Sequence, residues 1–169
     1  YTVGPVTERS LFEWHARRIL AAGRRHGFTP AWYVMTSPAN DAATRAFFGE
    51  HDHFGLAEGD VFFFSQAMLP AMDLDGRILL SAPDSLFLAP NGHGGSLAAL
   101  ATSGALEDMA RRGIETISYF QVDNPLARPG DTLFLGLHAD AGAGMSSKVV
   151  PKRDAGEKVG VLGLIDGRM

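Results

Sequence analysis

Two short apolar runs without charged residues constrain this chain more than any other feature. One is VFFFS at residues 61–65, and the other is AWYVMT at residues 31–36. Runs of this length, rich in aromatic and β-branched residues, are typical of strands that are buried, and the first fits a central strand of a parallel sheet covered on both faces. Because a helix is expected before each run, the order helix, strand, helix, strand predicts a layered α/β sheet.

The helix before the first run carries its own start and stop signals. Ser10 and Glu13 are spaced as a capping box, in which a hydroxyl and a carboxylate satisfy backbone donors at a helix start. Three basic residues fill the last turn, where they suit the helix dipole, and Gly27 can end it. The sequence therefore predicts a helix over residues 11–26.

The other expected elements follow from similar local signals. Residues 132–139 have the composition of a strand, but Leu133, Leu137 and Ala141 share one helical face, which favours a helix. In the first half of the chain we expect a helix after Asn40 or Asp41 that carries Phe47 and Phe48, a hairpin around Asp75-Gly76 and a short strand at 85–88. Helices at 95–103 and 105–112 should follow, the second with Glu107 and Arg111 as an ion pair. After them we expect a strand at 114–122, the helix at 132–139, and strands at 145–151 and 158–165 paired around a turn at 152–157.

Charge and composition exclude several classes of protein. With 15 basic and 19 acidic residues the net charge is −4, the wrong sign for a nucleic-acid-binding protein that neutralises phosphates. The chain has no cysteine, so disulfides, thiolate zinc sites and cysteine nucleophiles are ruled out. No apolar run approaches the length of a membrane span, and no signal peptide opens the sequence. A cytoplasmic location is the expectation.

A glycine-rich loop, Asn91-Gly92-His93-Gly94-Gly95, precedes one of the expected helices. Glycines let a backbone approach a flat ring or a phosphate closely, and His93 could donate a hydrogen bond there. A strained turn with a solvent-facing histidine explains the same residues equally well, because glycine-rich loops alone are a weak signal. Gln66 follows the 61–65 run, and its amide could read a nucleobase edge or could satisfy loop backbone.

Asp123 lies at the end of the expected 114–122 strand, before Pro125. Ligands of α/β sheets bind at the carboxyl ends of strands, and a carboxylate there can hold Mg²⁺. The alternative is a cap for the following turn. Lys148 and Lys152 could neutralise phosphate or be simply solvated. The cluster Glu50-His51-Asp52-His53 resembles metal ligands but lacks a distant third ligand.

Several of these stretches, in this order, make the chain resemble the central part of the eukaryotic-type UDP-sugar pyrophosphorylases. This family includes the UDP-N-acetylhexosamine and UDP-glucose pyrophosphorylases. The matching stretches are SLFEWH at 10–15, WYVMTS at 32–37, FF at 47–48, FGL at 54–56, FFSQAMLPAM at 63–72, the Gly92 loop, VDN at 122–124 and KVVPK at 148–152. They span almost the whole chain.

The resemblance implies a fold and a reaction. The fold would be a mixed, mainly parallel sheet with helices on both faces, Rossmann-like, as in nucleotide-diphospho-sugar transferases. The reaction would join UTP and a sugar 1-phosphate into a UDP-sugar and pyrophosphate, with Mg²⁺. By similarity, Gln66 and the backbone at Gly92 would recognise uracil, His93 would lie near ribose or sugar, Asp123 would hold Mg²⁺, and Lys148 or Lys152 would contact phosphate.

Two departures from the family pattern limit this expectation. The family's glycine-rich nucleotide loop would precede Tyr1, and its C-terminal sugar-phosphate part is absent as well. We therefore expect one catalytic domain that is incomplete at both ends and inactive alone, with an exposed sheet edge that could pair with a second copy. The acetylhexosamine enzymes also typically have asparagine where this chain has His93, whereas Met68 to Met72 resembles that branch, so the sugar stays open.

Two other functions fit the same residues. The chain could be a non-catalytic domain that binds uridine nucleotides or regulates a partner. It could also be an unrelated α/β interaction domain whose glycine loop is only structural.

Overall fold

The computed structural model describes residues 2–4, 6–164 and 166. The chain divides into two compact units, Tyr1–Asp131 and Thr132–Met169. Each unit is described by itself below.

The first unit is built on a pair of parallel strands, β3 (Trp32–Thr36) and β4 (Val61–Ser65). Trp32 pairs with Val61 and Thr36 with Ser65, so the two strands end at the same edge. The helix α2 (Asp41–Glu50) makes the crossover between them, as a parallel pair requires. Both apolar runs are therefore strands, as their composition predicts.

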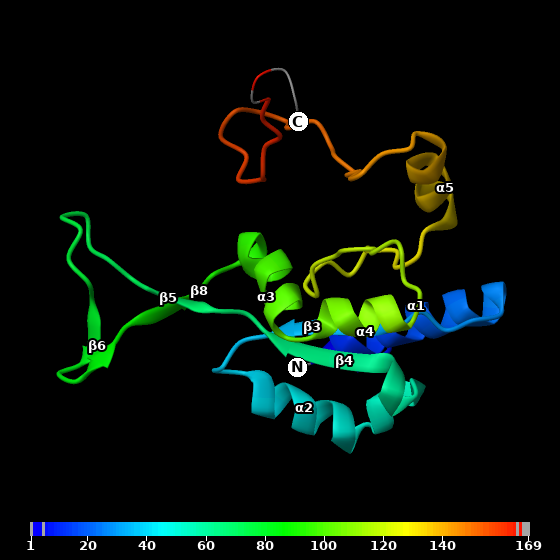
Figure 1. Ribbon diagram of the computed structural model, residues 1–169, viewed down its shortest axis with the longest axis horizontal. Coiled ribbons are helices and arrows are strands. Elements are labelled where there is room, and N and C mark those ends of the chain that lie inside the picture. Colours follow the sequence, from blue (N-terminus) through cyan, green and yellow to red (C-terminus); the bar gives the residue numbers. More distant parts are fainter. Residues whose placement is uncertain (1, 5, 165, 167–169) are drawn as a thin grey trace. The chain divides into compact units, whose positions relative to one another are not determined.

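The side chains of the two strands feed two separate hydrophobic cores, because successive residues of a strand point to opposite faces. On one face, Trp32 and Val34 pack with buried residues of α1 (Leu11–His26) and with Phe48 of α2. On the other face, Phe64 packs with α3 (Ser96–Thr102) and α4 (Ala105–Arg111). Figure 1 shows α2 and α3 on opposite sides of β4. The expected α/β layering, with helices on both faces of a parallel sheet, is confirmed.

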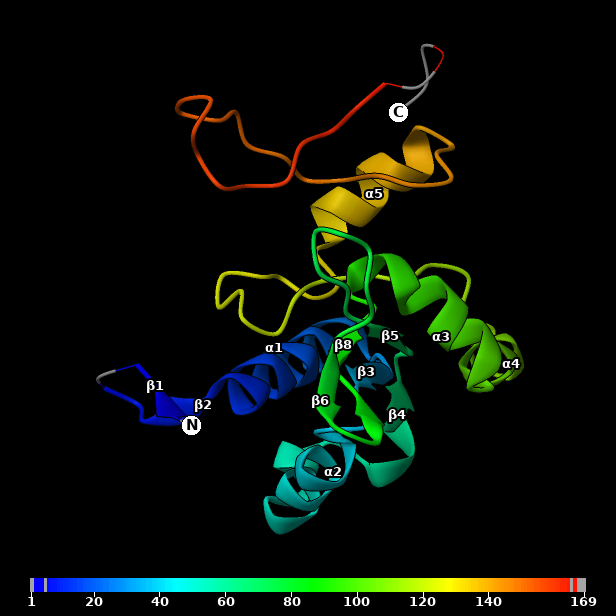
Figure 2. The same cartoon turned by 90° about the vertical axis from the view of Figure 1, so that its left-hand side faces the viewer.

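Helix α1 begins and ends at the predicted residues. The Ser10 hydroxyl accepts a hydrogen bond of 3.1 Å from the Glu13 amide, and Gly27 ends the helix with a φ of 80°. The Glu13 carboxylate forms ion pairs with Arg9 and Arg17, so only the hydroxyl half of the predicted capping box is seen. A short ribbon of β1 (Thr2–Val3) and β2 (Arg9–Ser10) leads into the helix (Figure 2).

After β4 the chain leads out into an arm of antiparallel strands, which Figure 1 shows running away from the helices. Its strands are β5 (Met68–Pro70) with β8 (Leu88–Pro90), and β6 (Leu80–Ala82) with β7 (Ser85–Leu86). The predicted hairpin is present, because the Asp73 and Gly76 amides donate to the carbonyls of Arg77 and Asp73.

The ion pair expected within α4 has a different acid. Arg111 contacts Asp108, not Glu107, at 2.9 Å, and Arg112 contacts the other oxygen of Asp108 at 2.7 Å. Asp108 also accepts a hydrogen bond of 2.7 Å from the Tyr33 hydroxyl on β3. Burial and this contact with a carboxylate raise the pKa of Tyr33 to about 12. Asp108 thus adds a hydrogen bond between α4 and the sheet to the packing of α4 on Phe64.

The predicted strand at 114–122 is wrong for the described chain, where these residues form no ladder. They have no regular secondary structure, and Ile114 packs against the second core and Phe120 against the first. A strand requires a partner with free backbone groups, and none of the described residues supplies one here.

The second unit contains α5 (Thr132–Asp140), which confirms the helix favoured at 132–139. The paired strands predicted at 145–151 and 158–165 are absent from residues 145–151 and 158–164, and residue 165 lies outside the described residues. Side-chain contacts hold the local chain instead: His138 bonds the Ser146 hydroxyl at 2.8 Å, and the Lys148 ammonium lies over the Phe134 ring. No helix in the described parts of either unit has the length and apolarity to cross a bilayer.

The buried His15 makes the stability of the first unit depend on pH. Burial, together with the nearby Arg18 cation, lowers the pKa of His15 below its usual 6.5, although its hydrogen bond to the Val122 carbonyl opposes the shift. Below pH 6.5 the unfolded chain therefore binds a proton that the folded chain does not, and the free energy of unfolding is expected to fall, by at most about 1.4 kcal/mol per pH unit for one proton.

Urea unfolding at pH 7.5 and pH 5.5 measures this dependence above the range where carboxylates titrate. A His15→Gln variant is expected to flatten it. An equal slope in the two proteins would assign the effect to other groups.

Candidate nucleotide site at the edge of the parallel strands

Gln66 lies immediately beyond β4 and connects the strand edge to the glycine-rich loop. The backbone N–H of Gln66 donates to the Thr36 carbonyl at 2.9 Å, which extends the parallel ladder by one step. Its side-chain Oε1 accepts a hydrogen bond of 2.9 Å from the Gly92 amide. Two residues singled out in the sequence, 26 positions apart, are thus in direct contact. The Gln66 NH₂ group has no acceptor among the described residues and is available to a ligand.

The glycines of the loop serve two separate purposes. Gly92 has a φ of 73°, a conformation that residues with a Cβ rarely adopt. A Cβ on Gly95 would lie 2.4 Å from the Asn91 side-chain nitrogen, so this position admits only glycine without a rearrangement of Asn91. The helix expected from residue 95 begins as α3 at Ser96, after a single 3₁₀ turn over His93–Gly95.

His93 is exposed and held at both ring nitrogens. Its Nε2 accepts a hydrogen bond of 2.7 Å from the Gln121 side chain, and its Nδ1 donates to the Tyr119 hydroxyl. Burial raises the pKa of Tyr119, against the effect of its hydrogen bond to Ser96, so the phenol stays neutral near pH 7. The ring of His93 therefore has a fixed orientation at the surface of the loop.

Sequence reasoning did not single out Tyr119 and Gln121. A signal was present: residues 119, 121 and 123 alternate, and alternate residues of an extended segment point to one side. A polar stripe that ends on Asp123 could have identified both as part of the candidate site.

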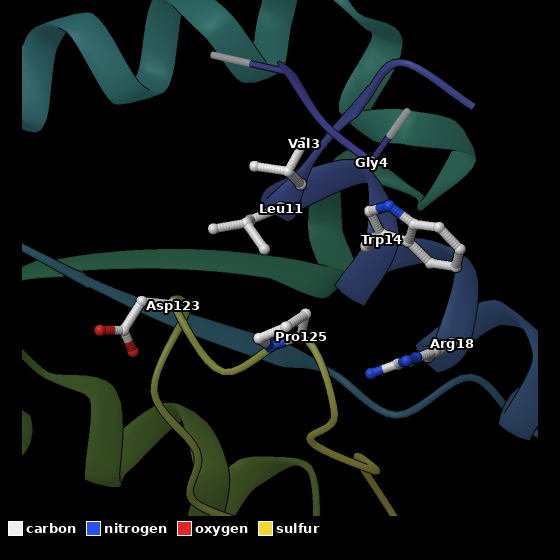
Figure 3. A pocket seen from close by; sticks show the side chains of 7 residues that line it. All are labelled: Val3, Gly4, Leu11, Trp14, Arg18, Asp123 and Pro125. Atoms are coloured by element: carbon white, nitrogen blue, oxygen red, sulfur yellow. The ribbon is translucent and has the colours of Figure 1, made fainter. Parts of the chain in front are cut away.

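Asp123 follows this segment and lies at the surface beside a groove of about 400 Å³. The groove is lined by Val3, Gly4, Leu11, Trp14, Arg18, Asp123 and Pro125. In Figure 3 the Asp123 carboxylate points away from Trp14 and Arg18. Its oxygens have no hydrogen-bond or ion-pair partner in the part of the chain that the structure describes.

Asp123 is suited to bind a Mg²⁺ ion that a bound nucleotide also holds. Mg²⁺ in nucleotide sites is typically held by one or two carboxylates, by water and by the phosphates of the ligand. An exposed carboxylate without a protein partner fits that pattern. The described residues contain no group of three or more metal-binding side chains. The cluster at 50–53 is not an exception: His51 bonds the Phe47 carbonyl at 2.8 Å, and Asp52 to Phe54 form a left-handed turn.

Lys148 and Lys152 belong to the second unit, and both are exposed. Lys148 makes the cation–π contact with Phe134. Their predicted contact with phosphate stays a prediction, as do the ligand roles of Gln66, Gly92, His93 and Asp123.

A pair of parallel strands with helices on both faces, and a glycine loop tied to Gln66 at the strand edge, place the chain in the α/β class of folds. Comparison with known families gives a more specific answer. The model of the family described as UTP–glucose-1-phosphate uridylyltransferase matches residues 3–169. The chain belongs to this family.

Relatives and a solved structure agree with the family. UDP-N-acetylglucosamine diphosphorylase 1 of Arabidopsis thaliana is 42% identical over 172 residues, which cover 96% of this chain and 34% of the plant protein. The human UDP-N-acetylhexosamine pyrophosphorylase-like protein 1 is 41% identical, covering 99% of this chain and 34% of its own length. The crystal structure of the Trypanosoma brucei uridine diphosphate N-acetylglucosamine pyrophosphorylase, in complex with an inhibitor, matches with a TM-score of 0.83 and 32% identity. The match covers 95% of this chain and 34% of that one. The chain thus spans about a third of these proteins.

Proposed function

We propose that a full-length protein containing this chain transfers the uridylyl group of UTP to a sugar 1-phosphate. A phosphate oxygen of the sugar 1-phosphate attacks the α-phosphorus of UTP, the bond from that phosphorus to the pyrophosphate oxygen breaks, and the products are a UDP-sugar and pyrophosphate. Family membership over residues 3–169 supports this reaction. The relatives named for N-acetylated sugars favour an N-acetylhexosamine 1-phosphate as the acceptor.

The hydrogen bond between Gln66 and Gly92 is the observation that carries the nucleotide half of the proposal. It leaves the Gln66 NH₂ free to donate to a uracil carbonyl, beside a loop whose glycines allow a planar ring to approach. The Gly92 carbonyl can accept from the uracil N–H. A purine presents a different order of donors and acceptors, so the arrangement favours uridine nucleotides.

The chemical step needs positioning and charge stabilisation more than acid–base catalysis. Asp123 would hold Mg²⁺, which when bound neutralises charge on the phosphates. His93, with its ring fixed by Tyr119 and Gln121, would line the ribose or sugar side. Lys148 or Lys152 would contact phosphate. Residence in the cytoplasm and pairing of two copies through a sheet edge remain predictions from the sequence.

Calorimetric titration of this chain with UDP and with ADP, each with Mg²⁺, tests the nucleotide half. We expect UDP to bind at least about 10-fold more tightly than ADP, because the Gln66 NH₂ and the Gly92 carbonyl would stay unpaired against adenine. A Gln66→Leu variant should lose this preference, whereas Gln121→Leu, outside the uracil side, should keep it. Equal affinity for both nucleotides in the unmodified chain would contradict the proposal.

Turnover separates the enzyme from a non-catalytic uridine-nucleotide-binding domain. The chain spans 34% of the plant relative, so the test is made on a full-length protein that contains it. A full-length protein containing it should form UDP-sugar from UTP and N-acetylglucosamine 1-phosphate. Binding of UDP without turnover in that protein would support the non-catalytic alternative.

His93→Asn is expected to change the choice of sugar. A shorter side chain cannot hold both the Tyr119 and Gln121 contacts, so it opens space beside the sugar and presents an amide that can pair with an acetamido group. We expect the ratio of kcat/KM for N-acetylglucosamine 1-phosphate over glucose 1-phosphate to rise by roughly 10-fold. His26→Asn, at the exposed end of α1, is the matched control. An unchanged ratio would exclude His93 as a determinant of the sugar.

A further inference from the structure

Two side chains of α1 donate hydrogen bonds to the backbone on either side of Asp123. His15 Nε2 donates to the Val122 carbonyl at 2.8 Å, and Arg18 donates to the Ala127 carbonyl at 2.5 Å. Residues three apart lie next to each other on one side of a helix. The two donors therefore form a single attachment surface, and the loop at 122–127 is fastened to it at both ends.

Within the described part of the chain, the other hydrogen bonds of this loop stay within residues 121–127. The Asn124 amide donates to the Gln121 carbonyl at 3.2 Å, the Ala127 amide donates to the Asn124 carbonyl at 3.2 Å, and the Leu126 amide donates to the Asn124 side chain at 3.0 Å. Such bonds give the loop its local shape without attaching it to the rest of the unit. No strand ladder reaches residues 114–123 in the described chain, so the two donors from α1 are the hydrogen bonds seen there to attach residues 122–127 to the rest of the unit. Just before the loop, Gln121 bonds His93 and Phe120 packs on the first core.

The surroundings of His15 indicate that the N–H of its ring is the group needed at this position. The side chain is fully buried between aromatic rings, with the Phe120 ring centroid at 4.8 Å. Its Nδ1 is the buried side-chain polar atom that lacks a hydrogen-bond partner within the described residues. A phenylalanine would fill the same space without burying an unpaired nitrogen. The polar contribution that remains is the bond from Nε2 to Val122.

We propose that His15 and Arg18 are positioning residues that fix the loop carrying Asp123, and so hold its carboxylate in one place. This inference rests on the proposed function, in which Asp123 binds Mg²⁺. Mg²⁺ demands near-ideal geometry from its ligands, so a carboxylate on a loosely attached loop would bind it less well. Neither residue touches the substrate in this scheme; both act through the backbone of the loop.

The test compares variants that differ only in this attachment. His15→Gln keeps a side-chain N–H that can reach Val122, whereas His15→Phe fills the space and loses the donor. Arg18→Met removes the second donor without touching the buried site. Arg17→Met is the matched control, because Arg17 is an exposed neighbour on the same helix that pairs with Glu13.

The first readout is the backbone order parameter of residues 121–127, measured by nitrogen-15 relaxation on this chain. We expect values near about 0.85, typical of rigid backbone, in the unmodified chain, His15→Gln and Arg17→Met, and a fall below about 0.6 in His15→Phe and Arg18→Met. Unchanged amide shifts in β3 would show that the fold is intact. Rigid values for this loop in both His15→Phe and Arg18→Met would overturn the proposal.

The second readout is the affinity for Mg²⁺ in the presence of UDP, expected to weaken at least about 10-fold in His15→Phe but not in His15→Gln. A mobile loop with unchanged Mg²⁺ affinity would overturn the link between the loop and the metal. If the unmodified chain binds no Mg²⁺–UDP, the proposed function fails for this chain. The order parameters then decide alone whether α1 fixes the loop.

Discussion

Asp123→Asn is expected to slow uridylyl transfer at least about 100-fold in a full-length enzyme that contains this chain. The substitution keeps the shape of the side chain and removes the charge that would hold Mg²⁺ against the phosphates of UTP. Because the carboxylate is exposed and has no protein partner among the described residues, the free energy of unfolding should change by less than about 0.5 kcal/mol. Activity and stability are therefore expected to separate.

Initial rates measured over a series of Mg²⁺ concentrations check this result. The deficit should shrink as Mg²⁺ rises if Asp123 contributes to metal affinity. Asp84→Asn is the matched control, since Asp84 is an exposed carboxylate on the arm, in the turn between β6 and β7. Equal rates and equal Mg²⁺ dependence in the two variants would remove Asp123 from the metal site.

Phe48→Ala is expected to lower the free energy of unfolding by about 3–5 kcal/mol, a large share of the stability of a domain this size. Phe48 is fully buried, and its ring lies about 5 Å, centroid to centroid, from those of Phe12, Phe54 and Phe63. Removing it leaves a cavity between α1, α2 and the sheet that the surrounding rings cannot close.

Urea unfolding followed by near-ultraviolet circular dichroism measures the loss, because the Trp32 ring lies 5.5 Å from that of Phe48. Phe28→Ala removes the same group from a side chain that is 64% exposed, and should cost less than about 1 kcal/mol. Similar losses in both variants would contradict the assignment of Phe48 to the centre of this core.

Elements whose signals are local could be predicted from the sequence. Helix α1 was predicted to the residue because a hydroxyl cap at Ser10 and a left-handed glycine at Gly27 act within one turn of the helix ends. The runs at 31–36 and 61–65 were predicted as strands because short apolar runs rich in aromatic and β-branched residues are typical of buried strands.

Elements that depend on a distant partner were predicted less well. Residues 114–122 have the composition of a strand, but composition does not supply a neighbour with free backbone groups. The same reason explains the failure at residues 145–151 and 158–164. Composition indicates that a segment can be extended, and only the tertiary structure decides whether it joins a sheet.

The candidate site shows the same division. Gln66, Gly92, His93 and Asp123 were singled out one by one, from residue type and position. Their connections were not predictable, because the bond from Gly92 to Gln66 and the contacts of His93 with Tyr119 and Gln121 join residues that are more than 20 positions apart. The attachment of the Asp123 loop to His15 joins residues 107 positions apart.

The last step of the parallel ladder, from the Gln66 amide to the Thr36 carbonyl, gives the two sides of the site unequal stiffness. Gln66 continues a strand packed on both faces, the kind of segment that opens only when a domain unfolds, whereas side-chain hydrogen bonds, which can break without unfolding the domain, hold His93 and the loop of Asp123. A base that docks at Gln66 would thus meet the part of the proposed site that opens least. The nucleotide can then serve as the reference point from which the rest of the reacting complex is aligned.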